Sequence, residues 1–125
     1  MTSLNLLRTA AAARFWNDLG RRAPRGEQIE ASFRRLGAAL HRQGLLSTAA
    51  TVREHIAGSQ SLFEEALLLD VGQHLVSREI GLLSFPLHSL NDLVQGLTAT
   101  SSVSLLPATL ESLNYLGFLK RMRPR

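Results

Sequence analysis

The chain has 125 residues and a formal net charge of +4, and it contains no cysteine. This length fits a single domain, residues 1–125, and the lack of cysteine excludes disulfides, thiolate catalysis and Cys-ligated zinc. Leucine (25) and alanine (14) far outnumber isoleucine (3) and valine (5), which favours helix over strand. We therefore expect an all-α protein, a compact bundle of five or six helices.

The first predicted helix runs from about Ser3 to Leu19 and leads into the arginine-rich stretch RFWNDLGRRAPR. Ser3 is a suitable N-cap, and Gly20 is the expected stop. The stretch holds the only tryptophan, for which two roles are open. Its ring either closes one end of the bundle or anchors a protein partner, because Trp and Arg are common at binding hot spots. The second role predicts a partner-binding set of Trp16, Arg14, Arg21, Arg22 and Arg25.

Residues 1–25 have a further interpretation as a targeting segment. They carry five arginines and one acidic residue on an amphipathic helix, and this composition resembles a mitochondrial transit peptide. The apolar stripe from Leu4 to Leu19 also fits the first helix of a bundle, which is the interpretation we favour.

Two further helices are predicted at about Glu27–Gln43 and Thr48–Ala57, with Gly44 as the stop between them. The sequence STAATVREH contains Ser or Thr, then Thr and Val three residues later, and then His. It resembles the recognition helix of bacterial response-regulator helix-turn-helix domains. The resemblance implies that Thr48, Thr51, Arg53 and His55 face DNA, with Arg42 and Arg53 on phosphates. Upstream the chain departs from that family, because Arg42 stands where a small residue is expected and the glycine comes early.

The fourth predicted helix, about Phe63–Leu83, is placed at the centre of the bundle. Ser61 and Glu64 have the spacing of a capping box. Apolar residues then cover most of the helix circumference, which is typical of a helix surrounded by others or buried in a dimer. Asp70 and His74 are four residues apart and could share a proton or a metal, but further ligands at suitable spacing are lacking. We expect a hydrogen-bonded pair on the helix edge.

The last two helices are predicted to begin at prolines. Pro86 opens one that ends near Leu97, residues 98–104 form a polar loop, and Pro107 opens the other. The basic residues at 120–125 are expected to form a short solvated tail.

Charge is segregated along the chain. Residues 1–58 have a balance of +5, residues 59–119 of −5, and residues 120–125 of +4. We expect the basic segments to lie against the acidic middle, within one chain or across a dimer.

The sequence favours a binding protein over an enzyme. The four histidines show no catalytic or metal-ligand spacing, there is no phosphate-cradling glycine loop, and no apolar run could span a membrane. We expect no catalytic residues, no cofactor and no metal, and a cytoplasmic location. The predicted function is a small regulatory protein of the anti-activator, adaptor or chaperone type that binds a protein partner through a helical surface, as a homodimer. The alternative is a helix-turn-helix transcriptional regulator that binds DNA through residues 48–56.

Overall fold

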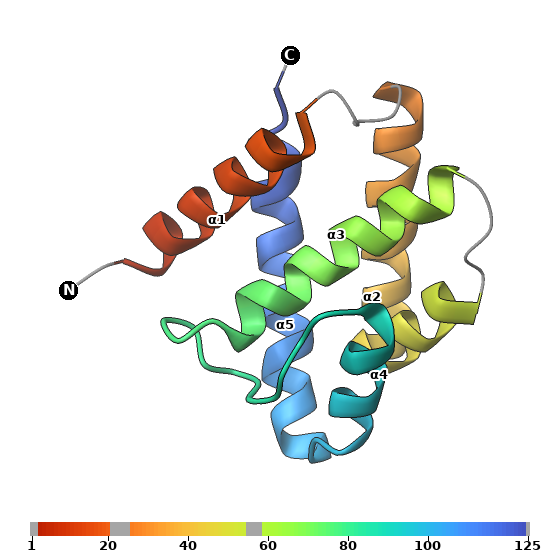
Figure 1. Cartoon of the computed structure of the whole chain (residues 1–125), viewed down its shortest axis with the longest axis vertical. Coiled ribbons are helices and arrows are strands. Elements are labelled where there is room, and N and C mark those ends of the chain that lie inside the picture. The colour runs from red at the N-terminus through yellow and green to blue at the C-terminus, as the bar shows by residue number, and fades with distance from the viewer. Residues whose placement is uncertain (1–2, 21–25, 55–58, 125) are drawn as a thin grey trace.

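The computed structural model describes residues 3–20, 26–54 and 59–124, and over these ranges helices are its only regular secondary structure (Figure 1). This confirms the predicted all-α bundle. The five helices are α1 (Leu4–Leu19), α2 (Gly26–Glu54), α3 (Ser59–Val76), α4 (Leu90–Thr98) and α5 (Ser102–Arg121). None of the described helices has the length and apolar character needed to cross a membrane.

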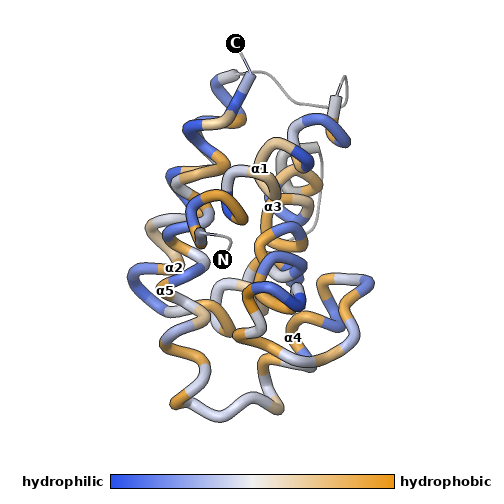
Figure 2. The backbone as a smooth tube through the Cα atoms, turned by 90° about the vertical axis from the view of Figure 1, so that its left-hand side faces the viewer, coloured by the Kyte–Doolittle hydropathy of each residue, from blue (hydrophilic) through white to orange (hydrophobic). Residues whose placement is uncertain are grey.

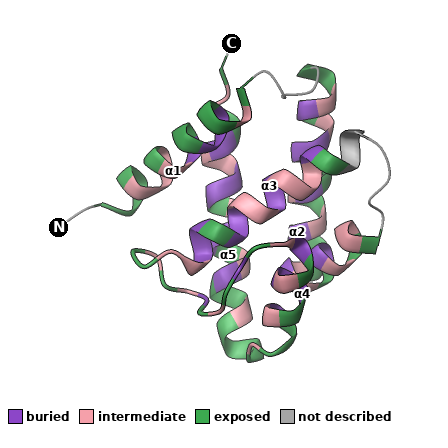
Figure 3. Ribbon diagram, in the orientation of Figure 1, coloured by how far each residue is buried: buried purple, intermediate pink, exposed green. Residues whose placement is uncertain are grey.

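Helix α3 lies at the centre of the bundle, as predicted from its wide apolar face. It contacts each of the other four described helices. Leu67, Leu68, Val71 and Leu75 are all 0–1% exposed. Figure 3 shows the buried residues gathered on the sides of α2, α3 and α5 that face one another, so one core serves the whole bundle.

Helix α1 begins and ends where the sequence predicts. The Ser3 hydroxyl accepts a hydrogen bond from the Leu6 amide, and Gly20 has a positive φ of 52° with its amide donating to the Trp16 carbonyl. The buried residues of α1 face α5 and α3. Helix α1 therefore packs as the first helix of the bundle.

Helix α2 spans the two helices predicted at 27–43 and 48–57, with a break at Gly44. This residue has φ 82° and ψ 174°, outside the helical range, so the axis bends there without an intervening loop. The bend frees the Leu45 amide, which donates to the Thr109 hydroxyl of α5 at 3.1 Å. Gly44 is thus a kink held against α5 and not a helix end. Residues 55–57 of the predicted third helix lie outside the described residues.

The prediction that the central helix extends to Leu83 is wrong, because α3 ends at Val76. Gly81 takes a φ of 61°, and the amides of Leu82 and Leu83 both donate to the Leu75 carbonyl. The chain therefore turns back on the end of the helix. Leu83 is still buried, but it belongs to a non-helical segment.

The starts of the last two helices are also corrected. Ser89, not Pro86, caps α4, since its hydroxyl accepts from the Asp92 amide while the Asp92 carboxylate accepts from the His88 amide. Ser101 caps α5, so Pro107 lies inside that helix. Proline has no amide hydrogen, so Pro107 cannot donate to the carbonyl of Val103 four residues earlier, and Val103 itself is 82% exposed.

Candidate functional site

A buried polar network joins α1, α3 and α5. Arg8 donates from Nε to Oε2 of Glu111 at 2.8 Å and from Nη2 to Oε1 at 2.5 Å, and His74 Nε2 lies 2.8 Å from Glu111 Oε2. The side chains of Arg8, His74 and Glu111 are 12%, 2% and 7% exposed, respectively. One carboxylate therefore links residues from three helices inside the core.

The electrostatics of this network fix its protonation at neutral pH. Burial alone would raise the pKa of Glu111, but the hydrogen bonds from Arg8 and His74 and the charge of Arg8 outweigh it and lower that pKa. Burial lowers the pKa of His74 below its ordinary value, more than its bond to Glu111 raises it. Glu111 is thus ionised and His74 neutral, with the Nε2–H of His74 donating to the carboxylate.

A second pair lies beside the first. Tyr115 donates its hydroxyl to Oδ2 of Asp70 at 2.6 Å, and the ring of Tyr115 stacks on His74 with centroids 4.1 Å apart. Burial raises the pKa of Asp70 to about 6, against the lowering effects of the Tyr115 bond and the Arg14 charge. Burial and the neighbouring Asp70 also raise the pKa of Tyr115.

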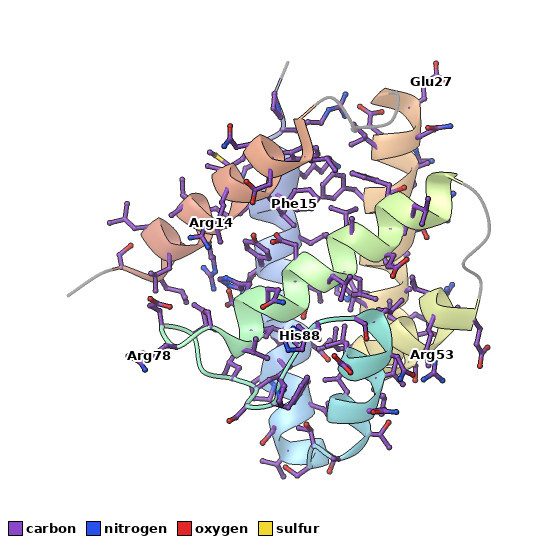
Figure 4. All side chains as sticks on the ribbon, viewed as in Figure 1. Arg14, Phe15, Glu27, Arg53, Arg78 and His88 are labelled. Carbon is purple, nitrogen blue, oxygen red and sulfur yellow. The ribbon has the colours of Figure 1, made fainter. Side chains whose placement is uncertain are left out.

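A pocket of about 400 Å³ adjoins this second pair, and its lining includes Arg14, Asp18, Asp70, His74 and Tyr115. Arg14 is labelled on α1 in Figure 4. In the described part of the chain, no group of three or more His, Asp or Glu side chains is placed to hold a metal ion. What the network does in this structure is hold three helices together.

The sequence singled out Asp70 and His74 but paired them wrongly. Asp70 bonds to Tyr115, 45 positions further along the chain, and His74 bonds to Glu111, 37 positions further. Both partners are on α5. Arg8, Glu111 and Tyr115 were missed. One signal was present, since Glu111 is the only charged residue between positions 93 and 119, and a lone carboxylate in an uncharged helix indicates an interior partner.

Trp16 occupies the bundle-closing position, which was one of its two predicted roles. Its side chain is in the core, with the residue 6% exposed, and Nε1 donates to the Leu119 carbonyl of α5 at 2.7 Å. The ring is therefore not on the surface, where an anchor for a partner would have to be. Arg14 is exposed, while the other predicted members of the set, Arg21, Arg22 and Arg25, lie outside the described residues.

The residues of the helix-turn-helix interpretation do not form a shared recognition face. Thr48 is 1% exposed and donates its hydroxyl to the Gly44 carbonyl, so it cannot reach DNA. Arg53 donates to Oδ1 of Asn91 at 3.1 Å. Arg42 and Thr51 are exposed, and His55 lies outside the described residues.

The structure thus defines a class: a small helical bundle in which buried ionisable side chains are bonded between helices. A family model of CRISPR-associated proteins, Cas_Cmr5, matches residues 8–123. The chain belongs to this family. No curated protein and no solved structure was found to match it.

Membership of this family corrects the predicted function. It indicates a CRISPR-associated subunit of the Cmr complex, and this overturns both the anti-activator, adaptor or chaperone interpretation and the helix-turn-helix alternative. The predicted protein partner fits a multi-subunit assembly. The homodimer, the cytoplasmic location and the absence of enzymatic activity stay predictions.

Proposed function

We propose that this chain is a non-enzymatic helical subunit of a CRISPR-associated Cmr complex and that it acts by binding neighbouring protein subunits. The observation that carries this proposal is the extent of the family match. Residues 8–123 include nearly all of the bundle, so the whole fold, and not an appended segment, is what the family shares.

The use of the polar side chains supports a structural role. The Arg8–Glu111–His74 network and the Tyr115–Asp70 bond each join separate helices. A general base must be free to reach the proton that it abstracts, and His74 instead has its Nε2 committed to Glu111 and its ring stacked on Tyr115.

The surface supports partner binding. Val103, Leu106 and Leu110 are 82%, 63% and 54% exposed, and their spacing of three and four residues puts them on one face of α5. Figure 2 shows hydrophobic residues continuing along α5 toward its start. Exposed apolar residues gathered on one helix face mark surfaces that a partner covers.

Co-expression of the chain with the other Cmr subunits of its source organism tests this proposal. We expect an affinity tag on another subunit to recover the chain at a fixed stoichiometry, measured by native mass spectrometry. Leu106→Glu with Leu110→Glu is expected to weaken recovery. Failure of the wild-type chain to co-purify would contradict membership of the assembly.

The non-enzymatic part needs its own measurement. We expect the purified chain to leave labelled single-stranded RNA and DNA intact. Cleavage that is lost in a folded His74→Gln variant but kept in Arg78→Gln would show that the chain is an enzyme.

A further inference from the structure

A groove of about 620 Å³ runs along α2 on both sides of the Gly44 kink and reaches α3 at Glu64. Its floor is apolar and shallow because Ala38 and Ala39 contribute only methyl groups, opposite Val52 after the kink. The bend at Gly44 turns the second arm of α2 toward the first. A concave surface therefore forms within a single helix.

Arginines form the rim of this groove. Arg35 is ion-paired with Glu64, which joins α2 to α3 along one edge. Arg34 and Arg42 are exposed, and within the described part of the chain neither makes an ion pair. They are eight residues apart, which places them about 12 Å apart along the helix axis.

We propose that this groove binds an acidic amphipathic helix from a neighbouring protein subunit. Apolar side chains of that helix would cover the floor at Ala38, Ala39 and Val52. Two carboxylates about two turns apart on the same helix would match the spacing of Arg34 and Arg42. The proposal rests on the proposed function, because the partner is a subunit of the same assembly.

The lining favours protein over nucleic acid. Grooves that bind single-stranded RNA combine a continuous basic surface with aromatic rings on which bases stack. None of the described residues that line this groove is aromatic, and the Glu64 carboxylate lies at its edge. An apolar floor between two unpaired arginines is instead complementary to an apolar helix face with acidic flanks.

The test is a site-specific crosslink in the assembled complex. Thr51 lines the groove and is exposed, so p-benzoylphenylalanine at position 51 reports what lies in it without filling the floor. We expect the crosslink, mapped by mass spectrometry, to join this position to a helical segment of another subunit that carries Asp or Glu. A crosslink to RNA, a crosslink to a second copy of this chain, or no crosslink would overturn the proposal.

Charge reversal supplies a matched pair of variants. Arg42→Glu is expected to lower the crosslink yield about tenfold, and Arg42→Lys much less, because the contact is electrostatic. Arg78→Glu changes the net charge equally, but position 78 lies in the turn after α3. In Figure 4 it is on the opposite side from Arg53, which directly follows the groove residue Val52. This variant is expected to leave the crosslink yield unchanged. Both positions are exposed, so the variants should fold, which thermal melting checks.

The failure of this inference can be told from failure of the proposed function. If the wild-type chain does not co-purify with the complex, the proposed function is wrong. If it co-purifies but the crosslink is insensitive to Arg34→Glu with Arg42→Glu, only the groove has been assigned wrongly. A Glu→Lys change at the crosslinked partner segment should restore the yield with Arg42→Glu.

Discussion

Trp16 connects the first and last helices through both parts of its side chain. The indole N–H bonds to the Leu119 carbonyl, and the ring lies 5.3 to 6.3 Å from those of Phe15, Phe33 and Phe63. A buried tryptophan needs a partner for its N–H, and α5 supplies it. This bond therefore fixes the orientation of the Trp16 ring within the aromatic cluster.

Two substitutions at Trp16 separate its apolar and polar contributions. Trp16→Ala should lower the free energy of unfolding by about 3–5 kcal/mol, because it leaves a cavity in the core. Trp16→Phe keeps most of the apolar contact and should cost about 1–2 kcal/mol for the unpaired Leu119 carbonyl. Urea unfolding followed by circular dichroism measures both. A Trp16→Ala chain as stable as wild type but unable to bind its partners would restore the anchor role.

Asp70 makes stability depend on pH. The folded state raises its pKa from 3.8 to about 6, so folding favours the protonated carboxyl. The contribution of Asp70 to the free energy of unfolding is fully present below about pH 4 and is lost as pH rises through about 6. The loss is about 3 kcal/mol at most. His74 has a lowered pKa, so its contribution changes in the opposite direction, rising with pH up to its ordinary pKa.

Asp70→Asn isolates the contribution of Asp70. Its amide oxygen can still accept from Tyr115, but it carries no charge. We expect the variant and wild type to be equally stable near pH 4, and the variant to be about 2 kcal/mol more stable near pH 7.5. The His74 effect is common to both chains and cancels in the difference. A stability difference that is constant from pH 4 to 7.5 would show that Asp70 titrates normally.

Residue types were easier to predict from the sequence than their partners. Asp70 and His74 stand out as polar residues on an apolar helix, and the four-residue spacing suggests that they bond to each other. Their actual partners are on α5, and helical periodicity carries no information about which distant residue a side chain will meet. The groove on α2 was missed for the same reason, since it forms from two arms of a kinked helix and from α3.

At the scale of the elements, two glycines let the non-helical segment 77–89 lie against its neighbours. A Cβ at Gly96 of α4 would lie 2.4 Å from ring atoms of Phe85, and one at Gly72 of α3 would lie 2.8 Å from Cδ2 of Leu87. Leu83 and Leu87 of this segment are buried. The segment therefore completes the core without being a helix.

Gly96→Ala should disturb this packing. The added methyl group displaces the Phe85 ring, and overpacking of this kind costs about 1–3 kcal/mol. Gly117→Ala on α5 is the matched control, because nothing lies within 4 Å of its Cβ position, and it should gain up to about 1 kcal/mol from helix propensity. Thermal melting compares them. Equal effects of the two variants would mean that Phe85 moves aside freely.

The same segment shows why some helix ends were predicted and others were not. Local signals determine the ends of α1, where Ser3 and Gly20 act within one turn. Residues 77–89 hold apolar residues at spacings that also fit a helix, and Pro86 is compatible with a helix start. Tertiary contacts decide there, because the Leu75 carbonyl and the α4 surface hold the chain in another conformation.

Over the whole molecule, the segregated charges are used to join separate parts of the chain. The Arg8–Glu111 and Arg35–Glu64 ion pairs each connect the basic front to the acidic middle, as the charge pattern predicts. The basic tail behaves differently, since Arg123 lies 3.7 Å from Glu30, a residue of the front. The charge pattern therefore predicts the docking of the front but not that of the tail.

The two ion pairs that cross from front to middle should respond differently to salt. In Arg35–Glu64 the side chains are 51% and 16% exposed, whereas those of Arg8 and Glu111 are 12% and 7% exposed. A double-mutant cycle with Arg35→Gln and Glu64→Gln should give a coupling of at most about 1 kcal/mol that vanishes near 1 M NaCl, because mobile ions reach the pair.

The corresponding cycle with Arg8→Gln and Glu111→Gln should keep its coupling near 1 M NaCl. Each single change leaves an uncompensated charge in the core and should cost about 3 kcal/mol or more, whereas the double change leaves none. Urea unfolding of the four chains at low and high salt measures both cycles. Equal loss of coupling in the two cycles would mean that solvent reaches Glu111, and that burial in this network does not protect the charges that dock α1 onto α5.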